Sequence, residues 1–260
     1  MKIQSVNSNN NYNFKARRKD IREADKIVRN VNLQFPAFSP TYVKYFWHPI
    51  NDKKIKLLEN QLLKIKSLRE RIDKEKEEDK FVIGIFDEIK KNKTANCEEK
   101  CWLTLGTLAA NGYNIGVKSA IGLNWEAYDR RNNKSILNGK MDLDHSAILT
   151  TMSNKKAKKA QDLIVLDPWL NKAMSYSEAS AEYLKLLNNK KMLEIYKKII
   201  DELNEKNPNS KIDLSNYNIR FNVIFIDGSS KYNIKSKGDM KEFGKKVTEK
   251  YPELILKEQK

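Results

Sequence analysis

The sequence predicts an α+β fold in which a helix that begins at a cysteine packs on an antiparallel sheet, with helical additions at both ends. Three observations predict it: an amphipathic helical period over residues 52–78, an apolar helix starting at Cys97, and strand-like segments that follow this helix. Helices and strands occupy separate stretches, which is typical of the α+β class. With 260 residues and 40% hydrophobic content, the chain can fill a core of this kind.

The N-terminal part is predicted to be a polar tail followed by a helical extension. Residues 1–16 are Asn-rich and without period, which indicates a flexible tail. Residues 17–80 form the extension, in which 21–49 indicates a short helix and then an irregular segment with three prolines. Residues 52–78 predict a long amphipathic helix that braces the core or forms half of a helical hairpin, with a coiled-coil dimer as the alternative. Its apolar residues recur at spacings of three and four: Ile55, Leu58, Leu62, Ile65, Leu68 and Ile72.

Residues 81–260 are predicted to form the main α+β domain. A second helix is expected at 80–90, and a loop at 92–96. An apolar helix follows from Cys97 to Ala110 and should end at Asn111-Gly112, since glycine after the last periodic residue is a common helix stop.

After Gly112 the sequence pattern changes from helical to strand-like. Strands are expected at 113–123, 140–152 and 162–166, with a polar turn near 130–133. Helical period returns over 177–205, with a break near Asn188-Asn189. Residues 218–227 are apolar on both faces, which favours a central strand, and a last helix is expected over 239–250.

Composition and charge exclude several classes of protein. The formal charge of +16 is dispersed, with Lys interleaved with Glu and Asp, and no motif or basic stripe with aromatic residues predicts specific nucleic-acid binding. No apolar run approaches the roughly 20 residues of a membrane span, and no signal peptide is apparent. We therefore expect a cytoplasmic protein, or one exported by a signal-peptide-independent route.

Cysteine and histidine usage predicts neither a disulfide framework nor a metal site. Cys97 and Cys101 lie four residues apart on one predicted helix, where a bridge between them is poorly placed, so reduced thiols in a reducing compartment are expected. Only two histidines are present, His48 and His145, and the spacing matches no ordinary zinc finger. No cofactor is expected, and the oligomeric state is left open.

Cys97 is the candidate nucleophile. The first turn of a helix stabilises a thiolate, because the backbone N–H groups there and the helix dipole favour negative charge. Thr94 or Asn96 can cap this helix, and Glu98 and Glu99 are typical first-turn residues.

His145 and Asp167 are the candidate partners of that thiol. His145 lies in a predicted strand, where the adjacent Asp144 points to the opposite face and is a poor orienter of the ring. Asp167 ends the next strand, and the following Pro168 ends the ladder, so the carboxylate stands at a strand terminus. Trp169 is expected to shield the contact between imidazole and carboxylate from water.

These segments together resemble a known superfamily. NCEE opens an apolar helix that ends in NGY, and DHSAIL and LIVLDPW follow in order. This pattern is similar to the Cys, His, Asp order of papain-like and transglutaminase-like cysteine enzymes, and especially of bacterial effector cysteine proteases and deamidases. The resemblance covers residues 92–172, and segments 1–80 and 175–260 match no family that we can name.

The resemblance implies a catalytic triad of Cys97, His145 and Asp167 acting through a thioacyl intermediate. The backbone N–H of Cys97 would be one oxyanion donor, and Asn92 and Asn96 are candidates for the second. The implied function is a cysteine protease acting on a protein or peptide. A glutamine deamidase or transglutaminase using the same triad, and a peptidoglycan amidase, are the alternatives.

Structural interpretations compete with these roles. Cys101 is a rival nucleophile, although it lies a full turn inside the helix, and His48 is interpreted as structural or exposed. Free cysteines on apolar helices and histidines in strands are usually core residues. The rival class is therefore a non-enzymatic interaction protein that binds its partner through the helix over 52–78 and its basic surface.

Overall fold

The structure is a computed structural model of the whole chain, and it describes residues 18–39, 52–72, 78–113, 116–132, 134–152, 162–186, 189–206, 217–227 and 237–256. The predicted tail over 1–16 and His48 lie outside these residues. Among the described residues the fold is α+β, as predicted, with seven α-helices and one five-stranded sheet. None of the described helices is long and apolar enough to cross a membrane.

The strand order in the sheet is β4-β3-β2-β1-β5. The five strands are β1 (Val117–Asp129), β2 (Ser135–Thr150), β3 (Ile164–Asp167), β4 (Lys172–Ser175) and β5 (Tyr217–Asp227). β2 pairs antiparallel with β3, and β3 pairs antiparallel with β4. The chain divides into two compact units, one formed by residues 120–144 and 177–226 and the other by residues 14–119, 145–176 and 227–260.

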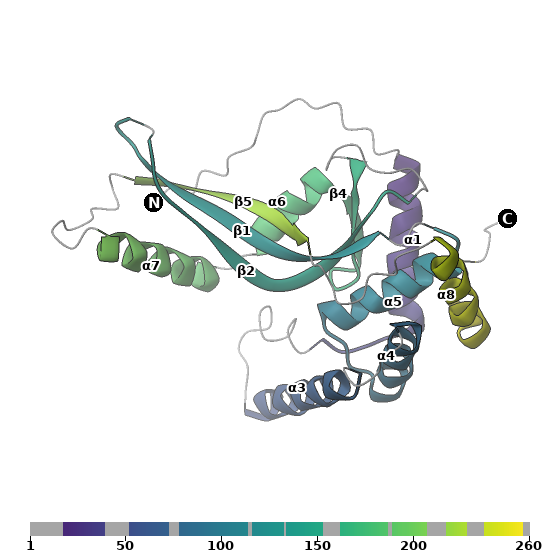
Figure 1. Cartoon of the computed structure of the whole chain (residues 1–260). Coiled ribbons are helices and arrows are strands. Elements are labelled where there is room, and N and C mark those ends of the chain that lie inside the picture. The colour runs from purple at the N-terminus through teal and green to yellow at the C-terminus, as the bar shows by residue number, and fades with distance from the viewer. Residues whose placement is uncertain are drawn as a thin grey trace. The chain divides into compact units, whose positions relative to one another are not determined.

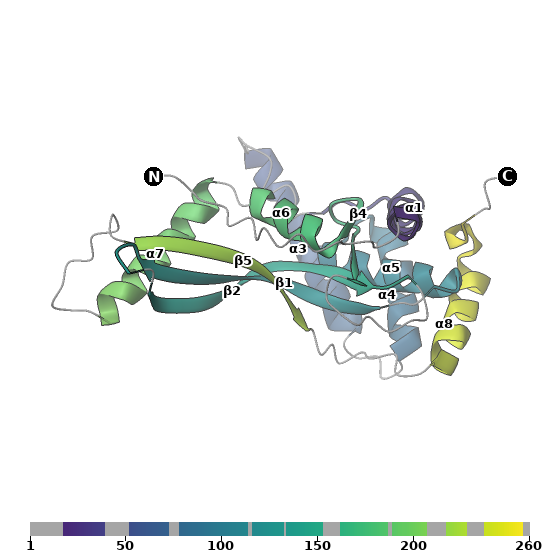
Figure 2. The ribbon, with the colours of Figure 1, turned by 90° about the horizontal axis from the view of Figure 1, so that it is seen from above.

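The first unit contains residues 120–129 of β1, residues 135–144 of β2, and β5. Two helices belong to it, α6 (Tyr176–Leu186) and α7 (Asn189–Lys206). Figure 2 shows β5, β1 and β2 running side by side. Tyr183 of α6 packs edge-on against Phe225, and Tyr196 of α7 against Phe221. The expectation of a central strand here is wrong: β5 ends the described strand order, and its apolar residues Phe225 and Phe221 pack against α6 and α7 and do not require a strand on each side.

The second unit is built around α5 (Cys97–Ala110), which is buried from Cys97 to Leu108 apart from Glu98. Three helices contact it: α1 (Arg18–Gln34), α4 (Glu78–Asn92) and α8 (Lys237–Lys250). Figure 1 shows α5 crossing α1, with α8 beside its end. Gly244 permits the contact with α8, since a Cβ there would lie 2.4 Å from the carbonyl oxygen of Ala109.

α1 is longer than the short helix that the sequence predicts. It spans 17 residues, and one face buries Ala24, Ile27, Val28 and Val31 completely. That face contacts α5, β3 and β4, so α1 belongs to the core of the second unit. The full length of α1 is not predicted because this helix has few apolar residues, and because these are buried by elements distant in sequence.

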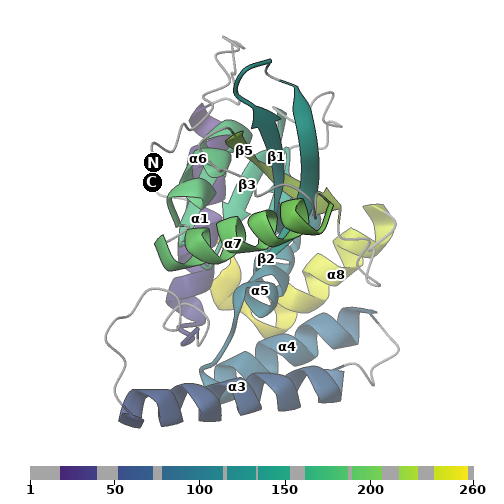
Figure 3. The same ribbon diagram turned by 90° about the vertical axis from the view of Figure 1, so that its left-hand side faces the viewer.

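α3 (Asp52–Ile72) lies beside α4, as Figure 3 shows. The sequence predicts a helix that continues to residue 78. As described, α3 reaches Ile72 and α4 begins at Glu78, two residues before its expected start, and residues 73–77 lie outside the described part of the chain. α3 buries Leu58, Ile65 and Leu68 and leaves Leu57, Leu62 and Leu63 exposed.

Strand boundaries also differ from the expected ones. β1 begins at Val117 and not at residue 113, and runs on to Asp129. The positive φ of Gly116, directly before Val117, is not compatible with strand backbone. β2 likewise begins five residues earlier than expected, at Ser135. β4 is not predicted from the sequence; its four residues pair with β3 directly after the turn that follows Asp167.

Candidate active site

Cys97 is the first residue of α5, where the sequence places it. Asn96 is the N-cap, and Asn96 and Glu99 form a capping box in which the Asn96 backbone N–H donates to Glu99 Oε2 at 2.9 Å. The helix behind Cys97 is enclosed by core residues, so its N-terminus is held firmly. Cys97 itself is 8% exposed.

The strand register brings His145 and Asp167 together. Ile148 pairs with Leu166 in the antiparallel ladder, so Asp167 stands level with Ala147. Side chains two residues apart on a strand share a face, which places His145 on the same face as Ala147 and diagonal to Asp167. His145 Nε2 lies 2.6 Å from Asp167 Oδ2, and both side chains are buried.

The second oxygen of Asp167 holds the turn that follows β3. The backbone N–H groups of Trp169 and Leu170 donate to Asp167 Oδ1 at 3.0 and 2.9 Å. The carboxylate is therefore fixed by its own backbone through one oxygen and presents the other to the imidazole. An Asp at the end of a strand is suited to this role, because its short side chain readily accepts bonds from backbone N–H groups two and three residues ahead.

His145 also forms a hydrogen bond with the Cys97 side chain. Because Nε2 faces Asp167, Nδ1 is the ring nitrogen that is available to Cys97. Burial by itself lowers the pKa of His145, but the Asp167 carboxylate, with a further contribution from Cys97, raises it to about 10. The ring thus favours the imidazolium form between a carboxylate and a sulfur, which is the charge state that supports an adjacent thiolate.

Trp169 covers the imidazole and connects it to the cap of α5. The rings of His145 and Trp169 have centroids 4.7 Å apart. The indole Nε1–H donates to Ser39 Oγ at 2.8 Å, and the Ser39 hydroxyl donates to Asn96 Oδ1 at 3.3 Å. Ser39 is brought there by a short parallel bridge between Phe38 and Thr94.

A buried lysine and an asparagine of α1 support the same turn. Lys100 Nζ donates to Asn32 Oδ1 at 3.0 Å, and Asn32 Nδ2 donates to the carbonyl oxygen of Pro168 at 2.8 Å. Burial lowers the pKa of Lys100, while the Asp167 carboxylate opposes this shift. The ammonium group therefore adds positive charge near the carboxylate that orients His145.

The rival thiol lies in a different environment. Cys101 is completely buried, and its Sγ donates to the carbonyl oxygen of Ser146 at 3.4 Å. Burial raises the pKa of Cys101 well above its usual value, and the negative groups around it add to the shift. The structure thus gives Cys101 the properties of a protonated core residue.

The two candidate oxyanion donors are placed differently. Asn96 lies next to Cys97 within the network of Ser39 and Glu99. Asn92 is the last residue of α4, and its side-chain amide donates to Glu88 one turn earlier at 2.8 Å. Asn92 is therefore engaged with α4, whereas Asn96 belongs to the cluster around Cys97. The side chain of Asp144 lies outside the described residues.

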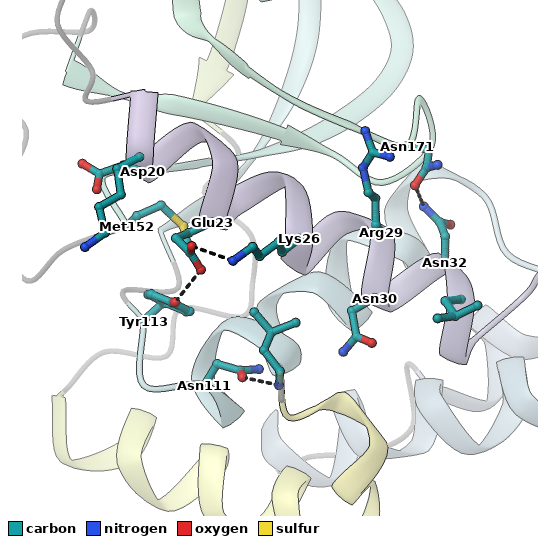
Figure 4. Close-up of a pocket in the computed structure, with 13 residues that line it drawn as sticks. Asp20, Glu23, Lys26, Arg29, Asn30, Asn32, Asn111, Tyr113, Met152 and Asn171 are labelled. Carbon is teal, nitrogen blue, oxygen red and sulfur yellow. Dashed lines mark hydrogen bonds and ion pairs between the residues drawn. The ribbon is translucent and has the colours of Figure 1, made fainter. Parts of the chain in front are cut away.

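A groove of about 1210 Å³ runs along the outer face of α1, and the three triad candidates do not line it. Figure 4 shows its wall, where Asn32 and Asn171 point toward each other and are joined by a hydrogen bond of 3.0 Å. Charges of both signs line it, including Glu23 and Lys26, which form an ion pair. Among the described residues, no cluster of three or more His, Cys, Asp or Glu could hold a metal ion.

Comparison of the chain with protein-family models, with curated proteins and with solved structures finds no match.

Sequence reasoning missed Ser39, Asn32 and Lys100. Each acts through a partner distant in the chain: Ser39 lies 130 residues from Trp169, and Asn32 lies 136 residues from Pro168. Lys100 offered one signal, since it is three residues after Cys97 and is the single basic residue of α5.

Proposed function

We propose that the protein is a cysteine enzyme that acts on amide bonds of a protein or peptide, with Cys97 as nucleophile, His145 as general base and acid, and Asp167 as the group that orients His145. The observation that carries this proposal is the position of His145, bonded to Asp167 through Nε2 and to the thiol of Cys97. The resemblance in residues 92–172 supports the same assignment and favours a papain-like or transglutaminase-like core.

The reaction would proceed by acyl transfer. The Cys97 sulfur attacks the carbonyl carbon, and the resulting oxyanion is stabilised by the Cys97 backbone N–H and the N-terminus of α5. As the C–N bond breaks, the imidazolium of His145 gives its proton to the leaving amine, which leaves a thioester on Cys97. Water, deprotonated by His145, then attacks the thioester and releases the acid and the free thiol.

The identity of the amide and of the second nucleophile distinguishes the candidate reactions. A backbone amide with water gives proteolysis, which is our first choice, and a Gln side chain with water gives deamidation. A Gln side chain with an amine gives transglutamination. Incubation with a Gln-containing peptide library and a primary amine, read by mass spectrometry, separates new chain termini, Gln-to-Glu conversion and amine incorporation.

Thiol reactivity tests the proposal without a known substrate. Iodoacetamide near neutral pH should label Cys97 much faster than free cysteine, whose thiol is mostly protonated there with a pKa of about 8.5. The C97S variant serves as the control, and peptide mass mapping identifies the labelled residue. Labelling of Cys97 no faster than free cysteine would contradict the proposal and favour a non-enzymatic interaction protein.

A further inference from the structure

Arg69 of α3 contacts both residues that follow Cys97. Its Nε donates to Glu99 Oε1 at 2.9 Å, and a terminal guanidinium nitrogen lies 3.3 Å from Glu98 Oε2. The neighbouring Leu68 is buried in the core, which anchors this end of α3. A side chain from the helical extension therefore reaches the N-terminus of the helix that carries Cys97.

Glu99 depends on this contact. Its side chain is only 3% exposed, and its two oxygens are divided between Arg69 and the backbone N–H of Asn96. A buried carboxylate is costly unless a cation and hydrogen bonds compensate it. Without the Arg69 guanidinium, the Glu99 carboxylate would be an unpaired charge in the capping box. It could still accept the backbone N–H of Asn96, but only as an uncompensated anion.

The charges around Cys97 also indicate that Arg69 supports the site. Glu98 and Glu99 place two negative charges directly after Cys97 in the first turn of α5, and like charges disfavour a thiolate. Two cations offset them: Arg69, and Lys118, which forms an ion pair with Glu98 and lies 5.2 Å from the ring centroid of Trp102. Burial by itself lowers the pKa of Arg69, but Glu99, Glu98 and Cys97 together raise it.

We propose that Arg69 is a positioning residue for Cys97, which holds Glu99 as the cap of α5 and neutralises the carboxylates beside the nucleophile. This inference rests on the proposed function and adds that the helical extension completes the site. The titratable and charged groups that surround Cys97 from the packed elements are Arg69, Glu98, Glu99, Lys100, Cys101, Lys118, His145 and Asp167.

The test measures the rate of Cys97 alkylation by iodoacetamide across pH in the full chain. R69M should lower the rate near neutral pH by about five- to ten-fold, with recovery at more alkaline pH, since one uncompensated charge near the thiolate has an effect of this order. R71M is the matched control, because Arg71 lies on the same helix, is equally exposed at 49%, and pairs with Glu88 instead. R69K, which keeps the charge, should retain most of the wild-type rate.

A second variant shows whether Arg69 acts through Glu99. In R69Q/E99Q the ion pair is replaced by a neutral amide pair, so the rate should return to within about two-fold of wild type. Equal rates in R69M and R71M would overturn the inference while rapid wild-type labelling still supports the proposed function. A double variant that folds but labels as slowly as R69M would also overturn it. If wild-type Cys97 itself is slow, both proposals fail.

Discussion

His145 Nε2 and Asp167 Oδ2 lie 2.6 Å apart, and neither residue is more than 9% exposed. The carboxylate cannot turn away, because its other oxygen accepts the backbone N–H groups of Trp169 and Leu170. The imidazole is therefore held in one orientation, with Nε2 on the carboxylate and Nδ1 toward Cys97. This relationship makes the proposed triad directly testable.

Replacement of Asp167 by Asn should change both the orientation and the charge of His145. Asn can keep the acceptor for the backbone N–H groups, but its NH2 group would face Nε2 and favour the tautomer with the proton on Nδ1. That tautomer cannot accept a proton from Cys97, so turnover should fall by about 10²- to 10⁴-fold. The melting temperature near neutral pH should also fall, because the variant loses the carboxylate that stabilises the imidazolium, and it should approach the wild-type value as the pH nears 10. The measurements are Cys97 labelling, turnover of a peptide substrate, and thermal unfolding.

D144N is the control for this variant, because Asp144 is adjacent to His145 in sequence. It should keep the wild-type rate. Equal losses in D144N and D167N, or none in D167N, would assign the orienting role to Asp144 or to a side-chain amide.

The raised pKa of His145 predicts how stability depends on pH. A pKa of about 10 in the folded protein, against 6.5 in the unfolded chain, means that the imidazolium stabilises the fold fully below about pH 6.5. Between these values the unfolded state binds fewer protons, so the free energy of unfolding falls by at most about 1.4 kcal/mol per pH unit. Above about pH 10 the contribution is lost.

Urea unfolding of wild type and H145Q across this range checks the prediction. The difference in unfolding free energy between the two proteins isolates the histidine, and it should shrink as the pH rises from 6.5 to 10. A difference that is constant over the range would show that His145 is not held as a cation.

The two cysteines should respond in opposite ways to substitution. C97A should abolish rapid labelling, whereas C101A should keep the labelling rate within about two-fold and lower stability by about 1–2 kcal/mol, since it removes a small buried side chain. Mass mapping of the alkylated peptide and chemical unfolding provide the two readouts. Loss of rapid labelling in C101A with native stability would transfer the nucleophile's role to Cys101.

Trp169 should contribute through both its ring and its indole N–H. W169F keeps an aromatic ring over His145 but loses the bond to Ser39, so turnover should fall by about two- to five-fold, as for S39A. W169A also exposes the His145–Asp167 contact to water and should cost clearly more. If W169A and W169F are equally impaired, the ring does not shield the pair.

Local signals in the sequence located much of the candidate site. The start of α5 at Cys97 and its end at Asn111-Gly112 follow from caps and stops that act within a few residues. Asp167 was placed at a strand end by the proline that follows it. These features depend on neighbours in the chain, so they could be predicted without knowledge of the packing.

The features that could not be predicted depend on distant partners. Arg69 and Glu99 are 30 residues apart, and Ser39 is 57 residues from Asn96, so no local pattern links either pair. The edge position of β5 is unpredictable for a related reason: its aromatic residues pack on α6 and α7, and sequence alone does not distinguish packing against helices from a place in mid-sheet.

The contact between α5 and α8 has a consequence for the newly made chain. Gly244 brings α8 against the end of α5, and this helix lies some 140 residues after Cys97 in order of synthesis. A nascent chain that already contains Cys97, His145 and Asp167 still lacks one of the helices that bury α5. Residues 237–250 must therefore leave the ribosome before α5 can be fully enclosed, so the surroundings of Cys97 stay incomplete until this helix has been synthesised.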